Sequence, residues 1–330
     1  MGWRTRVLNV DSRFLLGLYA IIPLTLLLQL ADHFMLGGRV RAMLPAQPES
    51  YLWYIFLFNL PHIMASLVTY ADREYLRAYR WPLLRAGLVA VFAPALMAAV
   101  IGINAFFIFI AFYTVYHVLM QQYGVSLMLM GRRPDLLFRI WRWVSILAAG
   151  MLYLDVYRPY AFQAYTHVTP QVLGGILTLL ALPFGLGFYV MARRAGAISV
   201  WSQAYYLASV AIVPVSCFDS FWGYPFMLVL IPRFVHDATA FAVYAVHDHN
   251  RNLAARHNWL YRVLAPLGVS PAILCLPLGV ALAWGLTAYQ DQSMTVMYAL
   301  VVLMLMHYGL EGVMWKRGSP HRRNTPFHIA

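Results

Sequence analysis

Long apolar runs, separated by short polar segments, follow one another along almost the whole chain. A helix needs roughly 20 apolar residues to cross a hydrocarbon core about 30 Å thick, whereas barrel strands would show short segments of alternating polarity. The pattern therefore predicts an all-α fold, a polytopic bundle of about ten transmembrane helices. The expected spans are 14–30, 51–70, 84–101, 103–130, 140–155, 172–191, 199–216, 224–249, 263–286 and 294–315.

Composition supports a protein embedded in a lipid bilayer. Of the 330 residues, 62% are hydrophobic and only 11% are charged. The net charge of +12 would favour nucleic-acid binding in a soluble protein, but here the basic residues gather in short loops between apolar runs. We therefore expect no nucleic-acid partner, because membrane orientation explains the charge better.

The basic residues lie in alternate loops, as the positive-inside rule requires. Both termini are thus predicted to be cytoplasmic, in a bacterial inner membrane, and residues 1–315 are expected to form a single membrane domain. Residues 316–330 are interpreted as a short, basic, disordered cytoplasmic tail. The basic set beyond the N-terminus is Arg73, Arg77, Arg80, Arg85, Arg132, Arg133, Arg139, Arg193, Arg194, Arg251, Arg256, Arg262, Lys316, Arg317, Arg322 and Arg323.

Four histidines share one depth in four separate spans. His62, His117, His236 and His307 lie about 11–14 residues from the outer ends of their spans, which places them roughly 16–21 Å deep. A single membrane histidine most often serves helix packing, but four at one level point to a metal or cofactor site. Neutral imidazoles suit iron, copper or zinc, with Fe(II) the first expectation, and fit magnesium or calcium poorly.

Polar residues accompany this level. Asp237 follows His236, Glu311 lies one turn below His307, and Gln121 stands in the same relation to His117. We expect Asp237, Glu311 and Gln121 to support catalysis by orienting imidazoles or offsetting metal charge.

A second polar group ends the eighth span. His247 lies about 16 Å along that helix from His236, so it is a reserve metal ligand that would need a kink to join the site. Interfacial solvation accounts for His249. The histidines of loops and tail receive no role: His33, His167, His257, His321 and His328.

Two stretches carry a resemblance to a known family. Pro61-His62 in an early span, and Phe241, Tyr244, His247 and Arg251 in a late one, resemble the Brp/Blh family of membrane β-carotene dioxygenases. The family's glycine and nearby aspartate after the first Pro-His pair are missing here. The resemblance implies nonheme iron held by histidines and an apolar polyene cleaved by O₂.

The residues alone leave three functions open. The first is a histidine-ligated metalloenzyme, an oxygenase or other oxidoreductase that takes O₂ and a lipid-soluble substrate from the bilayer. A proton-coupled transporter would also place His, Asp, Glu and Arg near the midplane. A haem-binding electron carrier would use pairs of histidines as axial ligands.

Overall fold

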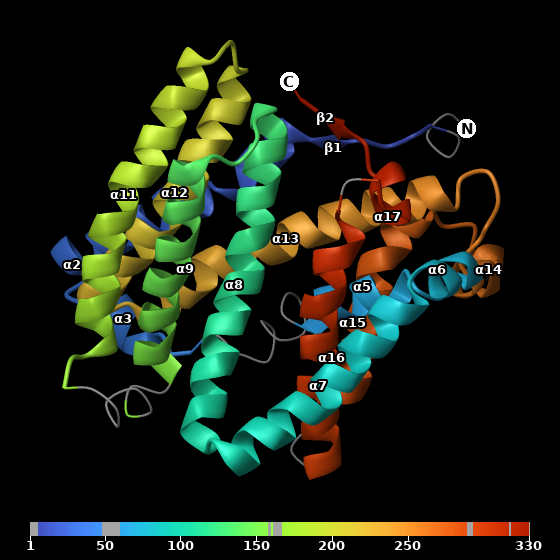
Figure 1. The fold of residues 1–330 in the computed structure, drawn as a ribbon, viewed down its shortest axis with the longest axis horizontal. Helices are drawn as coiled ribbons and strands as arrows, with labels where there is room; N and C mark the ends of the chain where they lie inside the picture. The colour runs from blue at the N-terminus through green and yellow to red at the C-terminus, as the bar shows by residue number, and fades with distance from the viewer. Residues whose placement is uncertain are drawn as a thin grey trace. The chain divides into compact units, whose positions relative to one another are not determined.

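The chain is helical almost throughout. The computed structural model describes residues 6–47, 60–157, 160, 167–288, 293–316 and 318–329. Within these residues, eight helical segments are long and apolar enough to cross a membrane (Figure 1). They are α1 and α2 together (Ser12–Leu18 and Ile21–Phe34), α7 (Arg80–Val100), α8 (Ile103–Met130), α9 (Leu136–Tyr157), α11 (Pro170–Arg194), α12 (Val200–Phe221), α13 (Pro225–Arg251) and α16 (Met294–Met314).

The remaining elements are short. They comprise α3 (Arg39–Met43), α5 (Leu60–Val68), α6 (Arg73–Ala78), α14 (Trp259–Val263), the 3₁₀ turn η3 (Ala265–Leu267), α15 (Pro271–Thr287) and α17 (Pro320–Arg323). Strands β1 (Val10–Asp11) and β2 (Phe327–His328) pair with each other, so segments from opposite ends of the chain lie side by side. The cytoplasmic location of both termini stays a prediction.

Helix α2 shows the polarity expected in lipid. Its buried face carries Thr25, Gln29 and Asp32, whereas Leu24 and Leu27 are each 64% exposed. A water-soluble protein would place these side chains the other way round. This arrangement indicates that the apolar face of α2 meets hydrocarbon, and the chain is an integral membrane protein.

Two predicted spans do not appear as full-length membrane helices. Residues 51–59 of the predicted span 51–70 lie outside the described residues, and the helix in the described part, α5, begins at Leu60. The predicted span 263–286 begins later, at Pro271, because α14 ends at Val263 and the turn η3 after it ends at the left-handed Gly268 (φ 65°). Helix α15 is therefore only 17 residues long, and the total of about ten spans stays a prediction.

The described chain divides into two compact units. The first contains residues 1–10, 51–97 and 237–328, and the second contains 11–50, 98–236 and 329–330. Helix α13 contributes to both, because the division falls after His236. In the second unit, α9 packs against α8 and α11, and α12 contacts α8, α9 and α11.

In the first unit, α5 packs against α15 and α16. The contact with α15 is a close backbone approach at Gly279, where an added Cβ would lie 2.6 Å from the carbonyl oxygen of Pro61. Small residues permit such approaches between membrane helices. The approach fixes the segment of α5 that directly precedes His62.

The sequence predicted a disordered tail for 316–330, but the described residues 318–329 contain a short helix, α17. Ser319 caps α17 by accepting a hydrogen bond from the backbone N–H of Arg322, with Pro320 in the first turn. His321 on this helix is fully buried. The serine–proline pair is a helix-start signal, and it explains why this basic segment is ordered.

We predict that Gly279→Ala destabilises the protein by about 1–3 kcal/mol, because the backbone oxygen of Pro61 cannot move aside as a flexible side chain would. Thermal unfolding in detergent measures the loss. Gly285→Ala, on the same helix, is the matched control, since a Cβ there meets nothing within 4 Å. Equal unfolding temperatures for the two variants would contradict the prediction.

Candidate metal centre

His62 and His307 form one pair of buried imidazoles. His62 lies on α5 and His307 on α16, and the two residues are 3% and 0% exposed. Their ring centroids are 4.9 Å apart and the rings meet edge to face. The packing of α5 on α16 brings the two rings together.

Each ring of this pair has a polar neighbour at Nδ1. Nδ1 of His62 lies 3.1 Å from a carboxylate oxygen of Asp237, and Nδ1 of His307 lies 2.7 Å from the hydroxyl of Ser66. Because an ionised carboxylate only accepts, it favours the tautomer of His62 that carries hydrogen on Nδ1. That tautomer leaves Nε2 as the atom that can bind a metal.

His117 on α8 and His236 on α13 form a second pair. Their ring centroids are 4.7 Å apart, again edge to face, and their side chains are 6% and 1% exposed. Both helices are long and apolar enough to cross a membrane.

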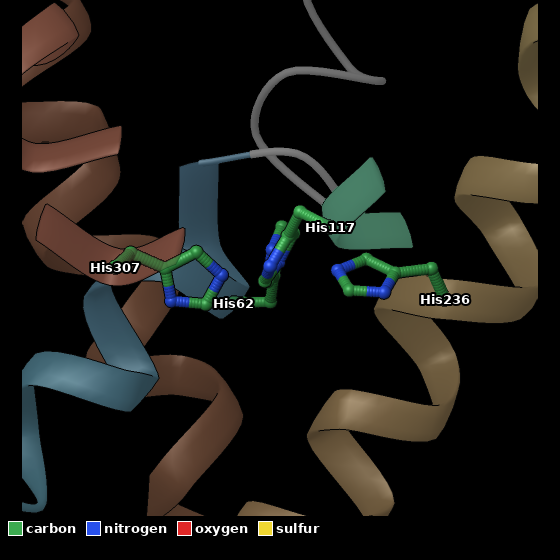
Figure 2. Close-up of side chains that lie close together, drawn as sticks. All are labelled: His62, His117, His236 and His307. Atoms are coloured by element: carbon green, nitrogen blue, oxygen red, sulfur yellow. The ribbon is translucent and has the colours of Figure 1, made fainter. Parts of the chain in front are cut away.

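All four histidines form one group that can hold a metal ion. Each offers one ring nitrogen, and these nitrogens all lie within 4.8 Å of one another (Figure 2). With metal–nitrogen distances near 2.0–2.1 Å, opposite ligands of one ion are about 4 Å apart. The observed set is therefore slightly wider than a bound ion requires, and its donor chemistry suits a transition metal.

The other predicted site residues, Asp237, Glu311 and Gln121, have three different surroundings. Asp237 lies beside His62, as described above. Glu311 is buried, and its carboxylate accepts a hydrogen bond from Tyr244. Gln121 is half-buried, and its side-chain oxygen has no hydrogen-bond partner among the described residues. The catalytic roles of these three residues stay predictions.

His247 belongs to another cluster, which also contains His321. Its Nδ1 lies 2.8 Å from Asp248 and its Nε2 lies 2.9 Å from the hydroxyl of Tyr75. Its ring stacks on that of His321, with centroids 4.6 Å apart. Both ring nitrogens of His247 therefore contact side chains outside the four-histidine group, which is typical of a structural histidine.

His321 is the buried residue that sequence reasoning missed. Its Nε2 lies 2.9 Å from the hydroxyl of Thr69, and its Nδ1 lies 3.0 Å from the hydroxyl of Tyr79. We call Thr69, Tyr75, Tyr79, His247 and His321 the tail-anchoring cluster, because it connects α17 to other elements of the first unit. His249, interpreted from the sequence as solvated, is also buried, and it contacts Ser270 and the carbonyl of Arg6.

Comparison with known proteins adds no relative. No protein-family model matches the chain, and neither a curated protein nor a solved structure shows significant similarity to it. The functional argument therefore depends on the geometry of the four histidines.

We predict that acid destabilises the protein partly through His321. Burial, followed by the nearby His247 and Arg251, lowers the pKa of His321 from 6.5 to about 2. Below pH 6.5 the unfolded chain binds a proton that the folded chain does not, so stability falls as pH decreases from 6.5. At about pH 5 the cost is about 2 kcal/mol.

The measurement is thermal unfolding in detergent at several pH values for the wild type and His321→Gln. The variant should lose part of the acid sensitivity, whereas His167→Gln, which changes an exposed side chain, should keep it. Parallel pH dependences for wild type and His321→Gln would show that this imidazole does not contribute.

Proposed function

We propose that the protein is a membrane metalloenzyme whose metal ion is bound by His62, His117, His236 and His307. The ion is nonheme Fe(II) in the first instance, with copper or zinc as the other candidates. The reaction is the oxidation or cleavage of an apolar, lipid-soluble substrate by O₂. The proposal includes a location in a bacterial inner membrane with both termini cytoplasmic.

One observation carries the proposal: four buried imidazoles offer nitrogens within 4.8 Å of one another in an apolar chain. Polar side chains inside a bilayer are rare and usually functional, and four imidazoles gathered at one point have the donor chemistry of a transition-metal site. One cation could be coordinated by all four rings together.

The donor set favours iron over the alternatives. Four neutral imidazoles leave the metal charge uncompensated, and the carboxylate of Asp237, 3.1 Å from the His62 ring, reduces that cost. A six-coordinate ion would retain two positions beyond four imidazoles, whereas tetrahedral zinc would be closed by them. Catalysis requires such an open position, and a bound Fe(II) would supply O₂ activation there.

The chain's own residues provide the binding and the environment. His62 and His307 are oriented through their Nδ1 neighbours, and the burial of all four rings excludes water from the site. Dry surroundings strengthen electrostatic interactions with a bound cation. Oxygen and apolar molecules both dissolve in lipid, so they can reach such a site without passing through water.

On the basis of the resemblance to the Brp/Blh family, a polyene is the first candidate for the substrate. A polyene such as a carotenoid is long, apolar and susceptible to oxidation, which fits a site buried in an apolar bundle. This choice of substrate rests on the resemblance of Pro61-His62 and of the Phe241–Arg251 segment alone.

The haem interpretation fits the four histidines less well. A porphyrin needs an open plane between its two axial ligands. Placed between any two of these imidazoles, it would have to displace the other two. The transporter interpretation remains an outcome of the experiments below.

We predict that protein purified in mild detergent contains one transition-metal ion per chain and shows no haem absorption band. His117→Ala and His307→Ala should each lose the metal, because each removes one donor from the same ion. His167→Ala is the control, since this exposed histidine lies outside the group. Metal content and the visible spectrum are the readouts.

The result separates the alternatives. A Soret band would replace the metalloenzyme by a haem protein. Folded protein that neither contains metal nor binds added Fe(II), Cu(II) or Zn(II) would end the proposal and direct attention to transport. Loss of metal in both variants would justify measuring O₂ consumption with β-carotene in detergent micelles.

We also predict that Asp237→Asn weakens metal binding roughly 10–100-fold while the ion still binds, because the variant loses the charge that orients His62. Titration with Zn(II) measures the affinity. Asp135→Asn is the matched control: Asp135 accepts a hydrogen bond from the Phe138 backbone as a helix cap, and asparagine caps equally well. Equal affinity for Asp237→Asn and the wild type would contradict the assignment.

A further inference from the structure

Asp219 and Gln29 form a polar contact inside the second unit. Asp219 lies two residues before the end of α12, and Gln29 lies five residues before the end of α2. Both residues are 0% exposed, and Nε2 of Gln29 donates to Oδ1 of Asp219 across 2.7 Å. The contact therefore links two apolar helices at a point that is closed to water.

Each member of this pair has a second oxygen that receives no hydrogen bond. Oδ2 of Asp219 and Oε1 of Gln29 are both buried, and neither has a hydrogen-bond partner among the residues that the structure describes. An ionised carboxylate only accepts hydrogen bonds, and so does the oxygen of an amide. These two oxygens can satisfy each other only if a hydrogen lies between them.

Asp32, three residues after Gln29 on α2, is equally buried but has a larger set of donors. Its Oδ1 accepts from the backbone N–H of Val40 at 2.8 Å. Its Oδ2 accepts from the backbone N–H of Arg41 at 3.0 Å and from the Tyr224 hydroxyl at 2.8 Å. Several donors favour the charged form of a carboxyl group. Asp219 has one donor, a neutral amide, and therefore lacks this stabilisation.

No basic side chain compensates a charge on Asp219, which forms no ion pair within the described part of the chain. The two basic residues nearby are exposed: Arg41 donates to the carbonyl of Trp222, and the ring of His33 stacks on the Trp222 ring. Burying an unpaired charge is costly, whereas a neutral carboxyl group avoids that cost. The titratable or charged side chains at this end of the second unit are Asp32, His33, Arg41, Asp155, Cys217 and Tyr224.

We propose that Asp219 and Gln29 form a proton-binding site in which Asp219 is a neutral carboxylic acid. Oδ1 accepts from the Gln29 amide, and the hydrogen on Oδ2 is donated to Oε1 of Gln29. One proton thus satisfies both remaining oxygens and adds a second hydrogen bond between α2 and α12. Carboxyl groups inside membrane helices commonly take part in proton transfer, so the ligand of this site is the proton itself.

The proton-binding site is independent of the proposed metal centre, because neither Asp219 nor Gln29 belongs to the four-histidine group. A hard cation is the other ligand that free oxygens attract. Calcium, however, takes about six to eight oxygen ligands, and this pair offers two unpartnered oxygens. A single proton requires only these two, which is why we favour it.

The test is infrared spectroscopy of the full-length protein in detergent, with ¹³C-labelled aspartate side chains. Subtracting the spectrum of Asp219→Asn from that of the wild type at neutral pH should leave the carbonyl band of a protonated carboxyl group. Gln29→Leu should shift this band to higher frequency, because the carboxyl group loses its hydrogen bonds. Asp32→Asn is the matched control and should keep the band.

A difference spectrum that contains only carboxylate bands would overturn the proposal. Carboxylate bands that respond to added sodium or calcium would replace the proton by a cation. Either result would leave the four-histidine group untouched, so this test fails or succeeds independently of the metal proposal.

Thermal unfolding at neutral pH is the second readout. Asparagine at position 219 presents one acceptor and one donor, as a neutral carboxyl group does, so Asp219→Asn should unfold close to the wild-type temperature. Asp32→Asn turns an amide N–H group toward existing donors and should unfold about 4 °C lower or more. An equal loss in Asp219→Asn, or its failure to fold, would contradict a neutral Asp219.

Discussion

Each buried imidazole of this protein has two ring nitrogens, and each nitrogen needs a hydrogen-bond partner or a metal ion in place of water. This requirement links the helices more specifically than apolar contact does, because lipid solvates apolar side chains as well as protein does. Asp237 and Ser66 meet it on one side of His62 and His307, and hydroxyl groups meet it for His321. The four-histidine group could also hold a metal ion through one ring nitrogen of each residue. The fold and the proposed chemistry thus answer the same constraint.

The two histidine groups differ in the chemistry of the side chains around them. In the tail-anchoring cluster, both nitrogens of His247 and of His321 face protein partners, which suits a structural role. In the four-histidine group, rings face one another edge to face, and adjacent imidazoles are poor partners for each other when both offer lone pairs. Burial alone therefore does not distinguish a ligand from a structural histidine; the chemistry of its neighbours does.

The helical class, most of the long helices and the four-histidine group could be predicted from the sequence, because apolar length and depth depend only on position along the chain. Helix α8 begins and ends where the pattern places it. The span predicted for α15 began too early, at residue 263, because the 3₁₀ turn Ala265–Leu267 is as apolar as the helix that follows it. Depth also says nothing about rotation around a helix, so the contact between the Ser66 hydroxyl and Nδ1 of His307 required coordinates. The burial of His321 was not predicted, because the basic residues around it indicated a solvated tail. Ser319-Pro320 is nevertheless a sequence signal for the start of a helix.

Helix α17 has a consequence for the order in which the protein is assembled. His321 follows all the described apolar helices in sequence, yet its partners Thr69 and Tyr79 precede most of them. The neighbouring Asn324 makes similar contacts. Its backbone carbonyl accepts a hydrogen bond from the Asn250 side chain, and its own side-chain amide donates to the Tyr75 hydroxyl. During synthesis these early side chains are therefore made before their final partners. The tail-anchoring cluster can form only after α16 has been synthesised. Helix α17 therefore makes the final contacts with residues that were synthesised some 250 positions earlier.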